Sequence, residues 1–167
     1  MQNINVRKAI ITDIDSLIKL RLDYLQEDYG DNFTPDEISK ATIQLREYFN
    51  KYLDPAKDYF DEFIAVLAEI DDKVAATAFM VITEVPANIR AFPTGKKAVI
   101  INVLTYPEYR RQGIATKLLS YLIDEAKKSN ISFIELSATR MGKSVYEKLG
   151  FTESSNSDYT KMRLKLF

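Results

Sequence analysis

The sequence predicts an α/β fold in one domain, residues 1–167: a mixed, mostly antiparallel central sheet flanked by about four helices. Strand-like apolar runs alternate with segments whose apolar residues recur every three or four positions, as in amphipathic helices. Two strand-like runs are separated only by Asp71-Asp72-Lys73, which favours an antiparallel hairpin. Two others enclose a helical segment at 114–128, which favours a parallel strand–helix–strand unit.

The N-terminal part of the chain is expected to form a strand and two helices. The strand is expected at 3–11, and the first helix runs from residue 14 to the turn at Gly30. The second helix begins at Thr34-Pro35, with Thr34 as its N-cap, and ends before Pro55. The remaining expected elements are strands at 63–70, 74–83, 98–104, 131–137, 151–154 and 160–167, and helices at 114–128 and 141–149.

Composition limits the chemistry. The chain has no Cys and no His, so a Cys–His or Ser–His–Asp nucleophile and a zinc site built on thiolates or imidazoles are excluded, and we expect no metal. Carboxylates, Tyr, Lys, Ser, Thr or backbone groups must do any catalysis. No long apolar run or signal-like leader is seen, so no membrane contact is expected and the cytoplasm is the expected location.

Charge is unevenly distributed along the chain. The net charge of −1 argues against broad nucleic-acid binding. Residues 1–95 hold 10 Lys and Arg against 17 Asp and Glu, a net of −7, whereas residues 96–167 hold 13 against 7, a net of +6. Two ligand surfaces of opposite preference would explain this asymmetry, as would unevenly solvated charge.

The segment 98–116 has the layout of a phosphate-binding loop. An apolar strand ends before Pro107, a short basic loop follows, and an amphipathic helix begins near Ile114. A helix N-terminus offers free backbone N–H groups and a positive dipole end to an anion. Gly113 would let the backbone approach the ligand closely. The segment therefore predicts a cradle for a pyrophosphate.

Two other glycine-rich phosphate motifs fit poorly. A dinucleotide fingerprint needs three glycines, and Gly113 is the only one near this loop. Gly142-Lys143-Ser144 matches the end of a Walker A loop, but Ser137 stands where the first glycine should be. A nucleotide phosphate binder remains an alternative function that these partial matches leave open.

Two motifs together resemble the GNAT superfamily of N-acyltransferases. The run Arg110-Arg111-Gln112-Gly113-Ile114-Ala115 is similar to that family's acyl-CoA loop, [QR]-x-x-G-x-[GA], and follows a family-like Pro107-Glu108-Tyr109-Arg110 turn. Downstream, Val145-Tyr146-Glu147-Lys148-Leu149-Gly150-Phe151 is similar to the family's "Y-E-K-x-G-F" ending. The close likeness covers 98–151, and the two N-terminal helices match the family fold in outline.

The resemblance implies a role for each matched position. Backbone groups at the end of one strand would pair with the pantetheine arm of acetyl-CoA, and one N–H would face the thioester carbonyl: Val103, Leu104 and Thr105. Backbone N–H groups of the loop would hold the pyrophosphate: Gln112, Gly113, Ile114, Ala115 and Thr116. Arg110 and Arg111 would add positive charge. Thr139 stands where many members carry an Asn that contacts the cofactor, and Tyr146 matches the family's general acid.

Direct acetyl transfer needs a neutral amine and a leaving thiolate that gains a proton. A lysine-like amine with a pKa of about 10.4 is neutral in only about one molecule in 2,500 at pH 7. Glu135, or Asn102 acting through an ordered water, is a candidate to relay the amine's proton. A phenol is a weaker acid than a thiol, so we expect Tyr146 to help mainly through a hydrogen bond that tightens as the C–S bond breaks.

The resemblance also places the amine acceptor near the first two helices. The acidic residues there are accompanied by Tyr24 and Tyr29, and they are Asp23, Glu27, Asp28, Asp31, Asp36 and Glu37. Such a mouth favours a cationic amine: a polyamine, an aminoglycoside-like amine, a lysine or a peptide N-terminus. We therefore expect an N-acetyltransferase that uses acetyl-CoA, and a homodimer is one assembly open to it. The alternative from another class is a non-catalytic acyl-CoA-binding or regulatory module.

Overall fold

The computed structural model describes residues 4–30, 32–153 and 164–166. Two compact units can be distinguished, a larger one at Met1–Ser137 and a smaller one at Ala138–Phe167. The larger unit contains a five-stranded sheet with strands in the order β1-β2-β3-β4-β5. Their bounds are β1 Ile4–Lys8, β2 Phe63–Ile70, β3 Lys73–Glu84, β4 Lys96–Thr105 and β5 Ile134–Leu136. The first four strands pair antiparallel, and β5 pairs parallel to β4, which confirms the expected mixed sheet.

The expected antiparallel hairpin between β2 and β3 is present, and its turn is one residue shorter than the expected connection. Ile70 pairs with Lys73, so only Asp71 and Asp72 form the turn. Both have positive φ angles, 49° and 60°, as a type I′ turn requires. Asp tolerates this conformation better than most residues, so a two-residue connection is possible without glycine.

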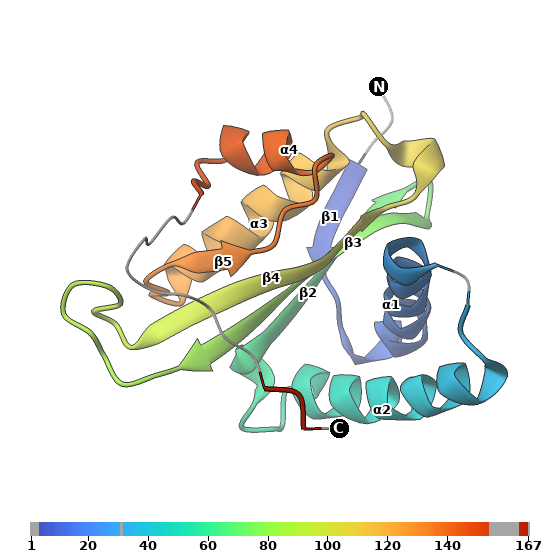
Figure 1. Ribbon diagram of the computed structural model, residues 1–167, viewed down its shortest axis with the longest axis horizontal. Helices are drawn as coiled ribbons and strands as arrows, with labels where there is room; N and C mark the ends of the chain where they lie inside the picture. Colours follow the sequence, from blue (N-terminus) through green and yellow to red (C-terminus); the bar gives the residue numbers. More distant parts are fainter. Residues whose placement is uncertain (1–3, 31, 154–163, 167) are drawn as a thin grey trace. The chain divides into compact units, whose positions relative to one another are not determined.

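Helices cover both faces of the sheet in the larger unit (Figure 1). On one side lie α1, at Ile14–Tyr29, and α2, at Pro35–Leu53, and on the other lies α3, at Ile114–Lys128. The start of α2 carries the predicted cap: the Thr34 hydroxyl accepts the Glu37 N–H, and the Glu37 carboxylate accepts the Thr34 N–H. The smaller unit contains α4, at Lys143–Lys148.

Aromatic side chains fill the core under α1 and α2. Phe49 of α2, Phe63 of β2 and Phe79 of β3 lie with ring centroids 5.5–5.8 Å apart, at the edge-to-face and tilted angles that aromatic rings prefer. On α3, the apolar stripe predicted from the sequence is buried, including Leu118 and Leu122. Strand β2 lies between these two layers, so seven of its eight residues are fully buried.

A β-bulge interrupts β4 near its end. Phe79 pairs with Ile101 and Thr77 with Leu104, so two residues of β4 lie opposite the single residue Ala78. Asn102 is one of the two, and its φ of 55° is in the left-handed region, where Asn is favoured among the side-chain-bearing residues. The bulge bends β4 just before the loop that leads to α3.

Several element ends differ from the expected ones. Strand β1 ends at Lys8, because the chain turns into a short 3₁₀ helix at Ile11–Asp13; the run 9–11 is apolar, yet Ile10 and Ile11 are exposed. Strand β5 is shorter than the expected 131–137. The expected strands at 151–154 and 160–167 fall largely outside the described residues; 151–153 and 164–166 are described and lie in no strand.

Candidate functional site

The connection from β4 to α3, residues 106–113 (here called the β4–α3 loop), is held in an unusual backbone conformation. A 3₁₀ turn at Pro107–Tyr109 is followed by two left-handed residues, Arg111 with φ of 61° and Gly113 with φ of 75°. A left-handed residue other than glycine costs on the order of 1–2 kcal/mol, so Arg111 must be stabilised by its surroundings. Such conformations are often found where a loop is shaped to bind a ligand.

The start of α3 is open to an incoming anion. Gly113 is the N-cap residue, no side chain caps the helix, and the first turn contains no acidic residue. A Cβ built on Gly113 would meet no described atom within 4 Å. Ile114 is buried and anchors the helix, whereas Gln112, Gly113 and Thr116 are exposed. The unbonded N–H groups and the positive dipole of this first turn are therefore available to a phosphate group.

The outer edge of β4 is free for part of its length within the larger unit. Strand β5 pairs only with Ala98–Ile100 of β4, while β3 pairs with β4 as far as Thr105. Past Ile100, the backbone groups of β4 on the β5 side have no strand partner among the described residues of this unit. Val103, Leu104 and Thr105 lie on this stretch, so an extended ligand arm could pair with it as an added strand.

Arg110 is engaged by protein groups. Its Nη2 atom donates to both carboxylate oxygens of Glu27 on α1, at 2.6 and 2.8 Å, and its Nε donates to the carbonyl oxygen of Thr105 at 2.8 Å. The side chain of Arg111 is exposed. The assignment of both arginines to the pyrophosphate stays a prediction, and for Arg110 the structure adds partners that the sequence did not indicate.

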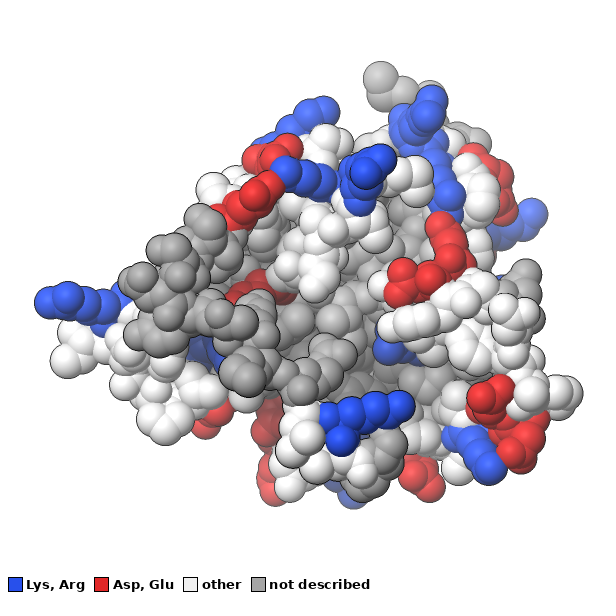
Figure 2. All heavy atoms as spheres, viewed as in Figure 1, with Lys and Arg blue, Asp and Glu red and all other residues white. Residues whose placement is uncertain are grey.

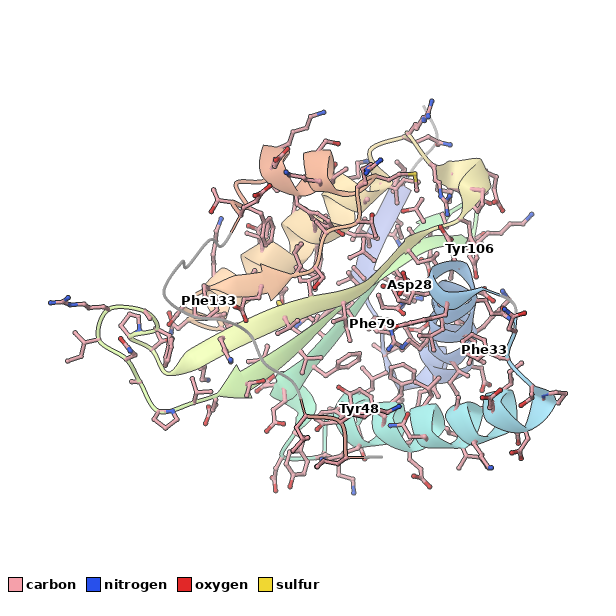
Figure 3. The ribbon with its side chains drawn as sticks, in the orientation of Figure 1. Asp28, Phe33, Tyr48, Phe79, Tyr106 and Phe133 are labelled. Atoms are coloured by element: carbon pink, nitrogen blue, oxygen red, sulfur yellow. The ribbon has the colours of Figure 1, made fainter. Side chains whose placement is uncertain are left out.

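A second polar contact joins α1 to the same loop. The hydroxyl of Tyr106, the first residue of the β4–α3 loop, donates to the Asp23 carboxylate at 2.5 Å, and Lys19 also donates to that carboxylate. Burial and the neighbouring Asp23 raise the pKa of Tyr106, and the hydrogen bond to Asp23 raises the pKa of Lys19. Tyr106 therefore stays protonated at neutral pH. Figure 3 shows it at the end of β4, above α1.

The bulge residue Asn102 is buried beside α1. It is 2% exposed, and its Oδ1 accepts a hydrogen bond from Arg21 at 3.1 Å. Its Nδ2 has no hydrogen-bond partner among the described residues. The relay from Asn102 through an ordered water, suggested from the sequence, stays a prediction. Glu135, the other candidate, is exposed on β5 opposite Val99.

In the smaller unit, Tyr146 lies on α4 and packs on nearby residues of that unit. Its ring meets Phe151 edge-on at 6.0 Å, and a Cβ on Gly142 would come within 3.0 Å of it. Thr139 accepts the Gly142 N–H at 3.1 Å and so closes the turn before α4. The roles of Tyr146 as general acid and of Thr139 as a cofactor contact stay predictions. Lys143, the lysine of the Walker-like match, is paired with Glu147 and Glu153.

Several carboxylates of the predicted acidic mouth already have partners. Asp23 pairs with Lys19, Glu27 with Arg110 and Asp36 with Lys40, Glu37 caps α2, and Asp31 lies outside the described residues. Figure 2 shows red acidic side chains over the end of α1 that is nearest the β4–α3 loop. The paired charges lower the attraction of this region for a cationic acceptor.

A pocket of about 240 Å³ lies between α1 and α2. Its lining is mostly apolar and consists of Leu22, Leu25, Gln26, Phe33, Glu37, Ile38 and Ala41.

Among the described residues, no cluster of three or more acidic side chains is arranged to hold a metal ion. Likewise, no helix in the described part of the chain is both long and apolar enough to cross a bilayer.

A five-stranded mixed sheet between helices, with an open helix N-terminus after its fourth strand, is the fold of an acetyltransferase. The chain belongs to the acetyltransferase (GNAT) family, whose model matches residues 22–151. This confirms the resemblance drawn from the two motifs. The solved structure of a predicted acetyltransferase with acetyl-CoA from Clostridium acetobutylicum is 32% identical, with a TM-score of 0.77 over 96% of both chains.

Two curated relatives are named as acetyltransferases of specific amines. The [ribosomal protein bS18]-alanine N-acetyltransferase of Escherichia coli K12 is 36% identical over 62 residues, which cover 35% of this chain and 42% of that protein. The match thus spans less than half of the E. coli protein. The N-alpha-acetyltransferase of Sulfurisphaera tokodaii is 27% identical over 153 residues, which cover 89% of this chain and 80% of that protein.

Proposed function

We propose that this protein is an N-acetyltransferase that transfers the acetyl group of acetyl-CoA directly to the α-amine of a polypeptide. The open N-terminus of α3 behind Gly113 carries the proposal, because it offers backbone donors to a pyrophosphate and lies next to the free edge of β4. The pyrophosphate would bind at the first turn of α3, and the pantetheine arm would run along Val103–Thr105.

In the proposed reaction the acceptor amine attacks the thioester carbonyl carbon. A C–N bond forms, the C–S bond breaks, the nitrogen loses a proton and the coenzyme A thiolate gains one. An N–H group of the β4 edge would stabilise the developing oxyanion, and Tyr146 would donate a hydrogen bond to the departing sulfur. No acyl-enzyme is required, which agrees with a chain that has neither Cys nor His.

The free energy needed to deprotonate the acceptor amine favours an α-amine. A lysine amine costs about 4.6 kcal/mol to deprotonate at pH 7, whereas an α-amine with a pKa near 7.8 costs about 1 kcal/mol. The α-amine therefore needs less help from a base to become neutral. The names of the two curated relatives point the same way.

The test measures thiol release from acetyl-CoA with three acceptors: a lysine-free peptide with a free N-terminus, a peptide with a blocked N-terminus and one lysine, and spermidine. We expect turnover with the first and at least tenfold lower kcat/KM with the other two. Faster turnover of spermidine or of the lysine peptide would overturn the α-amine assignment. Acetyl-CoA binding without thiol release with any of the three would favour a non-catalytic binding module.

A Tyr146→Phe variant tests the proposed acid in the same assay. We expect kcat to fall by about 10²-fold or more while the Kd for acetyl-CoA stays within twofold, because the hydroxyl acts on the departing sulfur. An unchanged kcat would remove Tyr146 from the mechanism.

A further inference from the structure

Two side chains at opposite ends of the 3₁₀ turn in the β4–α3 loop reach the same helix. Tyr106 precedes the turn and donates to Asp23 at 2.5 Å; Arg110 follows it and binds Glu27 through both carboxylate oxygens. Asp23 and Glu27 are four residues apart on α1, so they lie one above the other on one face of the helix. Tyr106 and Arg110 are also four residues apart in the chain, and each of them binds one of these two carboxylates.

These contacts fix the two ends of the 3₁₀ turn that precedes the left-handed residue Arg111. Backbone hydrogen bonds from Tyr109 to Tyr106 and from Arg110 to Pro107 close the 3₁₀ turn. The ring of Tyr106 packs against the core under α1. The Nε of Arg110 donates to the Thr105 carbonyl oxygen, so Arg110 is also held by the end of β4. The left-handed Arg111 comes next in the chain. Fixing Arg110 from two sides restricts the path of the backbone into that conformation.

We propose that Asp23 and Glu27 of α1 form a latch that holds the β4–α3 loop in its anion-binding shape, and that Arg110 is a positioning residue rather than a ligand of the phosphates. This inference rests on the proposed use of acetyl-CoA. Figure 2 shows acidic side chains over the end of α1 that points in the direction in which the loop lies in Figure 1. The Arg110 guanidinium already uses three of its donor contacts within the protein.

The test compares the affinity for acetyl-CoA of Glu27→Gln, Arg110→Gln and the double variant with that of the wild type. An exposed ion pair contributes up to about 1 kcal/mol, so we expect each single variant to bind two- to fivefold more weakly. The double variant should bind no more weakly than the weaker single variant, because both changes open the same latch. Amide hydrogen exchange in the loop should accelerate by a similar factor in all three.

A direct role of Arg110 in binding phosphate predicts a different pattern of acetyl-CoA affinities. If Arg110 binds phosphate, Glu27→Gln frees it and leaves acetyl-CoA affinity unchanged or higher, while Arg110→Gln alone weakens binding. That result overturns the latch, and so does an unchanged affinity in both single variants. A charge swap, Glu27→Arg with Arg110→Glu, should recover part of the lost affinity under the latch. It should bind more weakly than Arg110→Gln if a phosphate contacts residue 110.

Asp15→Asn is the matched control. It removes an ion pair of similar length, 2.7 Å to Arg46, from the other end of α1, and changes the net charge by the same amount. We expect its acetyl-CoA affinity and loop exchange to equal those of the wild type. If the wild type itself fails to bind acetyl-CoA, the proposed function fails; if it binds and the Glu27 variant has no effect, the latch alone fails.

Discussion

At the scale of single residues, Gly113 offers the most direct test of the anion site. Its φ of 75° disfavours any side chain, and the space over it is open. We expect Gly113→Val to cost about 1–2 kcal/mol of folding stability from the left-handed backbone. It should also weaken coenzyme A binding at least tenfold, because the side chain would stand where the pyrophosphate binds.

Isothermal titration with coenzyme A measures the effect at Gly113, and Gly95→Ala is the control. Gly95 precedes β4 with φ of 70°, so a side chain there is also strained, and it lies at the end of β4 opposite the β4–α3 loop. The control should lose stability and keep its affinity. Undiminished binding by the Gly113 variant would refute the cradle.

Asn102 makes a second residue-level prediction, about the bulge. In a regular strand, Ala is more stable than Gly by roughly 0.5–1 kcal/mol, because Gly loses more backbone entropy on folding. At φ of 55° the order should reverse, because Ala pays about 1 kcal/mol or more for the left-handed conformation. Asn102→Gly should therefore unfold at a higher urea concentration than Asn102→Ala. The ordinary order, with Ala the more stable, would contradict a left-handed residue here.

At the scale of elements, β1 is tied to its neighbours by an ion-pair network. Arg7 contacts Asp13 at 2.7 Å and Glu69 of β2 at 2.6 Å. Hydrogen bonds from Arg7 hold the pKa of Asp13 below its usual value, and Asp13 is largely shielded from solvent. A carboxylate with a lowered folded-state pKa stabilises the protein above its unfolded pKa of about 3.9, and this contribution is lost as the pH falls through the folded-state value.

We therefore expect Asp13→Asn to lose about 1–2 kcal/mol of stability at pH 7 and to lose less than the wild type on going from pH 5 to pH 2.5. Urea unfolding at the two pH values measures the difference. Lys40→Gln, which breaks an exposed pair on α2, is the control and should change the pH dependence little. An equal acid sensitivity of Asp13→Asn and wild type would show that this network does not govern acid stability.

The elements that follow local rules were predictable from sequence, and the exceptions have physical causes. The α2 cap at Thr34, the hairpin between β2 and β3 and the N-terminus of α3 depend on neighbouring residues, and all three are found. The predicted end of β1 was wrong because an apolar run favours a strand in sequence analysis even where the side chains, here Ile10 and Ile11, are exposed. The bulge at Asn102 had one visible signal, a polar residue inside an apolar strand that also tolerates positive φ.

At the scale of the whole chain, part of the charge asymmetry is used inside the fold. Arg110 of the basic half forms an ion pair with Glu27 of the acidic half. Lys96 of the basic half likewise pairs with Glu84 of the acidic half. The contact between Glu27 and Arg110 joins residues far apart in sequence, so local patterns cannot reveal it. The family and the mixed sheet were predictable because their motifs are local; the partner of each charge was not.

The extra residue in β4 has a consequence for how such a sheet could be altered. A chain shortened by Asn102 would still place Ile101 beside Phe79 and Leu104 beside Thr77, so the pairing register with β3 would survive on either side. The bend in the strand would be lost, and the backbone after Ile100 would take a different direction along the edge that β5 leaves unpaired. One amino acid would then decide how this edge is presented to an extended ligand.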